Sequence, residues 1–160
     1  MRLLSAILKI LSFAVFIVII AMVAIAAPIL FGYHPAAVLS GSMEPVYPMG
    51  SIIYYKAAEF DDINVGDAVT FRVGQGVLAT HRVLVKDVEN RSFITKGDNN
   101  PSKDTTPLPY GRVAGKSTDF NIRYAGYFTN KLQNWRVIAI FAGILLLGVF
   151  VKPRKQKKYI

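Results

Sequence analysis

Two serines and a glycine stand together in residues 37–45, where Ser40 and Ser42 flank Gly41 at the end of a short apolar stretch. Small residues and hydroxyl groups in such a place are typical of a nucleophilic serine held on a tight turn. Ser-Gly-Ser is also common in ordinary loops. This segment alone therefore suggests a nucleophile without identifying one.

A serine nucleophile needs a base, and the sequence offers two histidines, His34 and His81. His34 follows a long apolar run and stands between Tyr33 and Pro35, which favours an interfacial role. His81 lies in an alternating, strand-like segment, where a histidine taken alone is more often structural. The chain has no cysteine, which excludes thiol nucleophiles, thiolate metal sites and disulfides. The sequence contains no HExxH motif, histidine pair or carboxylate cluster with ligand spacing, so we expect no metal and no other cofactor.

Four segments resemble, in order and content, the characteristic boxes of type I signal peptidases. They are SGSMEP at residues 40–45, GDAVTF at 66–71, THRVL at 80–84 and TKGDNNPSKD at 95–104. The resemblance covers about residues 3–115, and the four boxes together are highly specific. In the bacterial branch a lysine precedes the Arg-Val pair. This chain has His81 there, which resembles the branch of the endoplasmic reticulum, archaea and some spore-forming bacteria.

The resemblance implies a role for each matching residue. Ser42 matches the nucleophile and His81 the general base, which takes the serine proton and passes it to the leaving amine. The family's acidic residues fall on Asp98 and Asp104. The resemblance favours Asp104 as the third triad member and Asp98 as a supporting carboxylate, although sequence spacing does not separate them. The oxyanion is expected to meet the Ser42 backbone N–H, with help from the Ser40 hydroxyl.

The resemblance also implies the substrate, a secretory preprotein with small side chains at the minus-one and minus-three positions. An extended peptide can add to the edge of a sheet, with alternate side chains entering pockets. We expect the groove walls at residues 36–39, before the nucleophile, and 77–80, before the base. The groove residues are Ala37, Val38, Leu39, Leu78 and Ala79.

Two apolar segments are expected to anchor the candidate catalytic residues at a membrane. Residues 10–31, interrupted by Ser12 and Pro28, form a helix of roughly 33 Å, and a hydrocarbon core is about 30 Å thick. A cleaved secretory signal is the alternative, but this run exceeds the usual apolar region of such a signal, which is about 7–15 residues long.

Residues 135–151 are the second predicted span, with Trp135 at one end and a lysine-rich segment at the other. Its apolar core is short, so a helix packed on the domain is the alternative.

The net charge of +9 is concentrated at the ends of the chain, with two basic residues in residues 1–9 and five in 152–160. The segment between carries 12 basic and 10 acidic residues, which argues against a nucleic-acid partner. The positive-inside rule places both ends, residues 1–9 and 152–160, in the cytoplasm. Residues 32–134 then lie outside the cell or in the lumen, in a protein of the cell membrane or, in a eukaryote, of the endoplasmic reticulum membrane.

Residues 32–134 are predicted to be mainly β. Strand-like segments at residues 51–55, 68–71, 77–88, 91–96 and 112–115 are separated by Gly, Pro and Asn turns. Short strands of this kind indicate a small folded-sheet or barrel-like catalytic domain, flanked by N- and C-terminal transmembrane helices.

The sequence therefore predicts a membrane-bound serine endopeptidase that removes signal peptides, with the lipid bilayer and secretory preproteins as partners. Whether accessory subunits are needed stays open. One alternative is a catalytically silent membrane scaffold with a small β domain. Another is a self-cleaving or regulatory Ser–Lys protease of the same broad fold, but such repressors carry a DNA-binding domain that nothing here supplies.

Overall fold

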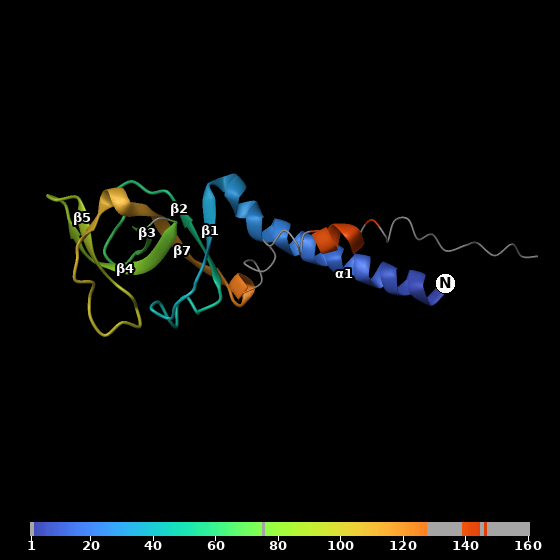
Figure 1. The fold of residues 1–160 in the computed structure, drawn as a ribbon. Coiled ribbons are helices and arrows are strands. Elements are labelled where there is room, and N and C mark those ends of the chain that lie inside the picture. Colours follow the sequence, from blue (N-terminus) through green and yellow to red (C-terminus); the bar gives the residue numbers. More distant parts are fainter. Residues whose placement is uncertain (1, 75, 128–138, 145, 147–160) are drawn as a thin grey trace, which may run out of the picture. The chain divides into compact units, whose positions relative to one another are not determined.

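The computed structural model of the chain describes residues 2–74, 76–127, 139–144 and 146 (Figure 1). The chain divides into two units, one formed by Met1–Ile25 with Thr129–Ile160 and the other by Ala26–Phe128. The first unit is helical where it is described, and the second contains the β-sheet.

The long helix α1 (Arg2–Ala26) confirms the predicted N-terminal apolar helix. Residues Ala6–Phe31 contain an 18-residue stretch with a mean hydropathy of 3.0 and are long and apolar enough to cross a membrane. A 3-10 helix, η1 (Ala27–Phe31), continues the chain past Pro28, and Gly32 ends it at a φ of 82°, a conformation that glycine adopts without strain.

The second predicted span, residues 135–151, is described only in part. Residues 139–144 and 146 are helical, and the Ser12 hydroxyl donates a 3.3 Å hydrogen bond to the Ile144 carbonyl oxygen. The rest of that span and the basic tail at residues 152–160 lie outside the described residues.

The β-rich unit is built on one antiparallel sheet in the order β1-β2-β7-β3-β4-β5-β6. This confirms the mainly β prediction, and the strand-like segments of the sequence fall on β2 to β5 and the start of β7. The sequence did not indicate β1, β6 or the length of β7. The strands are β1 (Tyr33–Ala37), β2 (Ile52–Lys56), β3 (Ala68–Gly74), β4 (Val77–Asp87), β5 (Ser92–Lys96), β6 (Leu108–Pro109) and β7 (Val113–Ile122).

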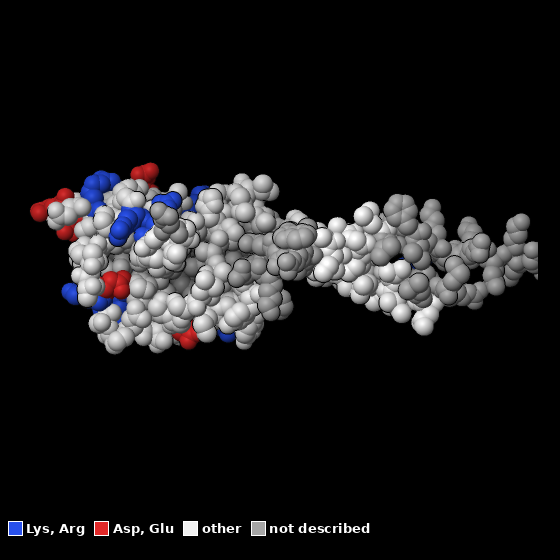
Figure 2. Space-filling view, viewed as in Figure 1, with Lys and Arg blue, Asp and Glu red and all other residues white. Residues whose placement is uncertain are grey.

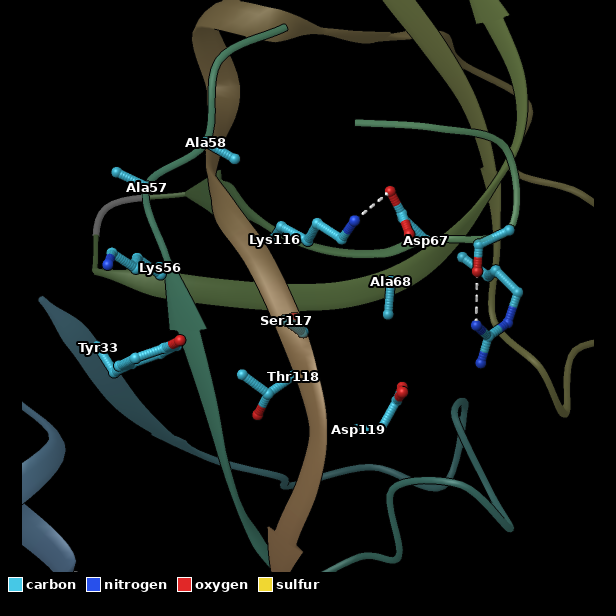
Figure 3. Close-up of a pocket in the computed structure, with 12 residues that line it drawn as sticks. Tyr33, Lys56, Ala57, Ala58, Asp67, Ala68, Lys116, Ser117, Thr118 and Asp119 are labelled. Atoms are coloured by element: carbon cyan, nitrogen blue, oxygen red, sulfur yellow. Dashed lines mark hydrogen bonds and ion pairs between the residues drawn. The ribbon is translucent and has the colours of Figure 1, made fainter. Parts of the chain in front are cut away.

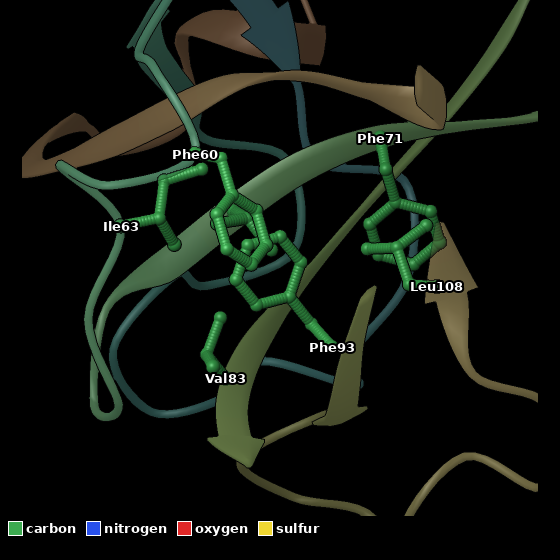
Figure 4. Packing of buried hydrophobic residues seen from close by; sticks show 7 residues of the cluster. Phe60, Ile63, Phe71, Val83, Phe93 and Leu108 are labelled. Carbon is green, nitrogen blue, oxygen red and sulfur yellow. The ribbon is translucent and has the colours of Figure 1, made fainter. Parts of the chain in front are cut away.

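The sheet has a hydrophobic cluster on each face, because successive side chains of a strand point to opposite sides. On β3, the buried Val69 belongs to the larger cluster and its neighbour Ala68 to the smaller one. Figure 4 shows the larger cluster, in which the rings of Phe60 and Phe93 lie 5.1 Å apart. Its buried members are Phe60, Ile63, Val69, Phe71, Val83, Phe93 and Leu108, and those of the smaller cluster are Met43, Tyr47, Ile53 and Ala68.

Charged side chains gather on the β-rich unit. In Figure 2 lysine, arginine, aspartate and glutamate side chains mark this unit, whereas the described part of α1 is almost entirely white. The apolar side chains of α1 are mostly exposed in this structure, including Phe13 at 65% and Val23 at 63%. This composition is compatible with anchoring in a membrane.

Candidate active site

The site is built at a free edge of β4. Strand β3 pairs with β4 on one side, where Val69 lies opposite His81. On the other side β5 ends at Lys96, opposite Arg82. Residues 77–81 of β4 therefore extend beyond the end of β5, and His81 stands where this edge becomes accessible.

The turn that follows β5 holds the serine segment. The backbone N–H of Asn99 donates a 2.8 Å hydrogen bond to the Ser42 carbonyl oxygen, and the Asn99 side chain donates to the Gly41 carbonyl oxygen at 3.2 Å. The Asp98 N–H contacts the Met43 sulfur at 3.4 Å. A Cβ at Gly97 would lie 2.6 Å from the Ser42 carbonyl oxygen, so only glycine allows this approach.

Ser42 is half-buried, next to a fully anchored neighbour. Met43 is 2% exposed and packs in the smaller hydrophobic cluster, which fixes the backbone on one side of Ser42. The Ser42 hydroxyl lies 3.4 Å from the Ser40 hydroxyl. The predicted nucleophile and its predicted helper are thus neighbours.

His81 and Asp104 form a close pair in the site. The His81 Nδ1 lies 2.6 Å from the Asp104 Oδ2. The Thr95 hydroxyl donates to the same carboxylate oxygen at 2.6 Å, and the Asp104 N–H donates to the Thr95 carbonyl oxygen at 2.8 Å. The Phe71 ring lies edge-on to the imidazole, with the ring centres 5.8 Å apart. A carboxylate on Nδ1 orients the imidazole and leaves Nε2 free for proton transfer.

Asp98 has a different partner. Arg82 donates to its two oxygens from Nε at 2.7 Å and from an Nη at 2.6 Å, and the other Nη donates to the Gly66 carbonyl oxygen at 2.7 Å. The hydrogen bonds to Asp98 raise the pKa of the Arg82 guanidinium above its usual value. The structure therefore separates the two carboxylates that sequence spacing left together.

Ser42 lies beside the turn that follows β5, and His81 lies on β4. Among the described residues, no hydrogen bond joins the side chains of Ser42 and His81. Catalytic hydrogen bonds are often long without substrate and shorten when it binds. His34 is separate from this site, on β1, with its ring 5.5 Å from that of Tyr55.

A hollow of about 310 Å³ adjoins Ser42, and we call it the groove hollow. It brings together all five predicted groove residues with Ser40 and Ser42. Ala36, Val77 and Thr80, which belong to the predicted groove walls, line it as well. Sequence reasoning missed the other members, Met43, Tyr47, Ile53 and Val73, which were not assigned to the groove. The full lining is Ala36, Ala37, Val38, Leu39, Ser40, Ser42, Met43, Tyr47, Ile53, Val73, Val77, Leu78, Ala79 and Thr80.

Tyr47, which sequence reasoning missed, and Thr80, from the predicted groove wall, both have hydrogen-bonded hydroxyl groups. The Tyr47 hydroxyl donates to the Thr118 carbonyl oxygen at 3.0 Å, and burial, reinforced by the charge of Asp119, raises the pKa of Tyr47 to about 12. The Thr80 hydroxyl lies 2.8 Å from the Thr70 hydroxyl, which in turn lies 2.8 Å from that of Ser117. The hollow therefore presents mainly apolar surface.

A larger cavity of about 590 Å³, shown in Figure 3, lies elsewhere in the β-rich unit. Its walls include the ion pair of Lys116 and Asp67 at 2.7 Å. None of the residues that the sequence assigned to the site lines it. Among the described residues, no group of three histidine, cysteine or acidic side chains could hold a metal ion.

Comparison with known protein families gives a match over residues 10–104 to the family described as signal peptidase, peptidase S26. The matched segment includes Ser42, His81, Asp98 and Asp104.

Comparison with individual proteins gives relatives in bacteria and in animals. Signal peptidase I W of Bacillus subtilis (strain 168) is 35% identical over 131 residues, which cover 76% of this chain and 68% of that protein. The signal peptidase complex catalytic subunit SEC11C of Homo sapiens is 30% identical over 130 residues, or 74% of this chain and 67% of that protein. The putative signal peptidase complex catalytic subunit SEC11B of Homo sapiens is 30% identical over 133 residues, covering 76% and 79%.

Proposed function

Because the chain belongs to the signal peptidase family, peptidase S26, and is a serine-type signal peptidase, we propose that Ser42, His81 and Asp104 are the residues that cleave the signal peptide. The 2.6 Å contact of His81 with Asp104 carries this proposal. It gives the imidazole the partner that a general base needs on its other ring nitrogen.

In the proposed mechanism the Ser42 hydroxyl attacks the scissile carbonyl while His81 Nε2 takes its proton. The tetrahedral intermediate collapses as His81 gives the proton to the leaving amine, and water then hydrolyses the acyl-enzyme by the reverse sequence. The Ser42 backbone N–H and the Ser40 hydroxyl stabilise the oxyanion. One such donor typically lowers the barrier by about 3–4 kcal/mol.

We also propose that the chain belongs to the histidine-dependent branch of the family, because His81 and Asp104 have these roles in the mechanism. Asp104 supports this assignment because a carboxylate at 2.6 Å orients an imidazole and stabilises its charged form during the reaction. Asp98 is proposed to support the site indirectly. Its bidentate bond with Arg82 steadies the turn that holds Ser42.

The groove hollow supports a preference for small side chains at the minus-one and minus-three positions. Its volume is about 310 Å³, and alanine, valine and leucine side chains form much of its wall. In an extended substrate, alternate side chains point to the same side, so the two positions before the bond that share a face would enter this hollow.

The membrane arrangement is proposed from the sequence and the anchor helix. We place residues 10–31 and 135–151 across the membrane, residues 1–9 and 152–160 in the cytoplasm and residues 32–134 on the other side. The human relative is named as a subunit of a complex, and accessory subunits are proposed here on that ground.

Cleavage of one preprotein by the purified full chain in detergent tests the proposal. The wild-type chain should release the mature protein, Ser42→Ala should release none, and Ser102→Ala, which alters an exposed loop serine, should act like wild type. Processing by Ser42→Ala would refute the assignment of the nucleophile. A wild-type chain without activity would favour a silent scaffold.

A further inference from the structure

A second hollow, of about 390 Å³, adjoins the site on the His81 side. Both His81 and Asp104 line it, together with two arginines, and we call it the arginine hollow. It shares Val73 and Ala79 with the groove hollow, so the two are neighbours. Its lining is Phe71, Arg72, Val73, Ala79, His81, Thr95, Asp104, Thr105, Thr106, Pro107, Leu108 and Arg112.

The charge of this hollow is unbalanced. Asp104 is the one acidic residue in its lining, and its carboxylate already contacts His81 and Thr95. Arg72 and Arg112 are exposed, and neither guanidinium takes part in a hydrogen bond or ion pair within the described part of the chain. The hollow therefore offers two planar cations to an anion, and guanidinium groups bind carboxylates in a two-pronged geometry.

The direction of the reaction indicates which part of a substrate reaches these arginines. On the proposed function, the acyl side of the scissile bond occupies the groove hollow beside Ser42. His81 gives its proton to the leaving amine, so the chain after the bond departs from the His81 side, where the arginine hollow lies. An extended chain advances about 3.3 Å per residue, which brings the second to fourth residues after the bond within reach of a neighbouring hollow.

We infer that Arg72 and Arg112 are specificity-determining residues that bind a carboxylate side chain of the substrate just after the scissile bond. This inference rests on the proposed function and adds a preference for aspartate or glutamate at the start of the mature chain. Since both guanidinium groups are exposed, the preference is modest and should weaken as salt is added.

Matched synthetic substrates test the inference with the full chain in detergent. One aspartate is placed at the second, third or fourth position after the bond, and each peptide is compared with its asparagine counterpart. At one or more positions we expect the wild-type kcat/KM to be roughly threefold to tenfold higher for aspartate. Arg72→Gln and Arg112→Gln should each reduce this ratio, and the double variant should bring it to about one.

The control variant is Arg123→Gln, which removes an exposed arginine that lines neither hollow and should keep the wild-type ratio. The same aspartate–asparagine pair placed before the bond should show no dependence on Arg72 or Arg112.

Equal rates for aspartate and asparagine at all three positions, with cleavage still dependent on Ser42, would overturn this inference and leave the proposed function intact. A preference for aspartate that persists in the double variant would also overturn the inference. An arginine-dependent preference for aspartate placed before the bond would do the same. If the wild-type chain cleaves none of the peptides, the proposed function fails and this inference fails with it.

Discussion

Asp98 and Asp104 are six positions apart in one segment, yet they bind different groups. Asp104 contacts the His81 Nδ1 at 2.6 Å, whereas Asp98 receives two hydrogen bonds from Arg82. A carboxylate next to an imidazole acts on proton transfer, and one paired with a guanidinium acts mainly on structure. Substitutions of Asp98 and Asp104 should therefore affect different properties of the protein.

Asp104→Asn should lower kcat while leaving the fold in place, because an amide cannot hold the imidazole in the same tautomer. The corresponding change in another serine protease lowers kcat about 10⁴-fold. Asp98→Asn should lower stability instead, by roughly 1–3 kcal/mol, since it weakens a partly buried charged pair. Thermal unfolding and kcat, measured for both variants, check the contrast. Equal loss of kcat in two equally stable variants would contradict it.

The identity of the base can be tested by exchanging it. His81→Lys introduces the residue of the bacterial branch at the same position. We expect little or no cleavage, because an ammonium beside Asp104 keeps its proton and cannot use the orienting carboxylate. Preprotein cleavage with the folded variant measures this. Near-full activity would show that the site does not depend on the histidine–aspartate pair.

At the scale of elements, the site depends on where strands end. Residues 77–81 of β4 extend past the end of β5, and the turn after β5 then meets the Ser42 segment through Asn99. In this arrangement Gly97 allows the turn to approach the Ser42 carbonyl oxygen closely. Its position in a turn does not by itself indicate this role.

Gly97→Ala should displace the Ser42 segment, because the added Cβ would lie 2.6 Å from a backbone oxygen. We expect kcat to fall at least tenfold, since small errors in the position of a nucleophile slow a reaction strongly. Gly111→Ala is the matched control, because nothing lies within 4 Å of its added Cβ. Wild-type kcat for Gly97→Ala would show that this close approach does not position Ser42.

The strands that the sequence predicted correctly have local signals, and those it missed do not. Alternation and β-branched residues mark β2 to β5, whereas β1 contains Pro35 and most of β7 has mixed composition. The pairing of β7 between β2 and β3 is a long-range property that no local pattern carries. For the same reason the sequence could name Asp98 and Asp104 as candidates but could not assign their partners, which come from the folding of β5 against β4.

At the scale of the whole molecule, the chain combines an apolar helix with a β-rich unit that contains the proposed site. Residues Ala6–Phe31 can cross a membrane by length and composition. The substrate of a signal peptidase carries an apolar segment of its own. Confining enzyme and substrate to one membrane raises their effective concentration.

The two-span arrangement predicts where reporters work. A reporter that is active only in the cytoplasm should function when fused after Ile160 and should fail when inserted near residue 90, because basic residues cluster at both ends of the chain. Reporter activity in intact cells measures both positions. A C-terminus found on the outside would mean that residues 135–151 do not span the membrane.

The most direct test of the central claim is a double-mutant comparison of preprotein cleavage by Ser42→Ala, His81→Ala and the variant with both changes. Members of one catalytic unit are strongly non-additive, since removing either one already stops the shared step. We predict that each single variant loses nearly all activity while remaining folded, and that the double variant is no slower than either. Substantial cleavage by a folded single variant, or a double variant slowed by the product of the two single effects, would contradict the account.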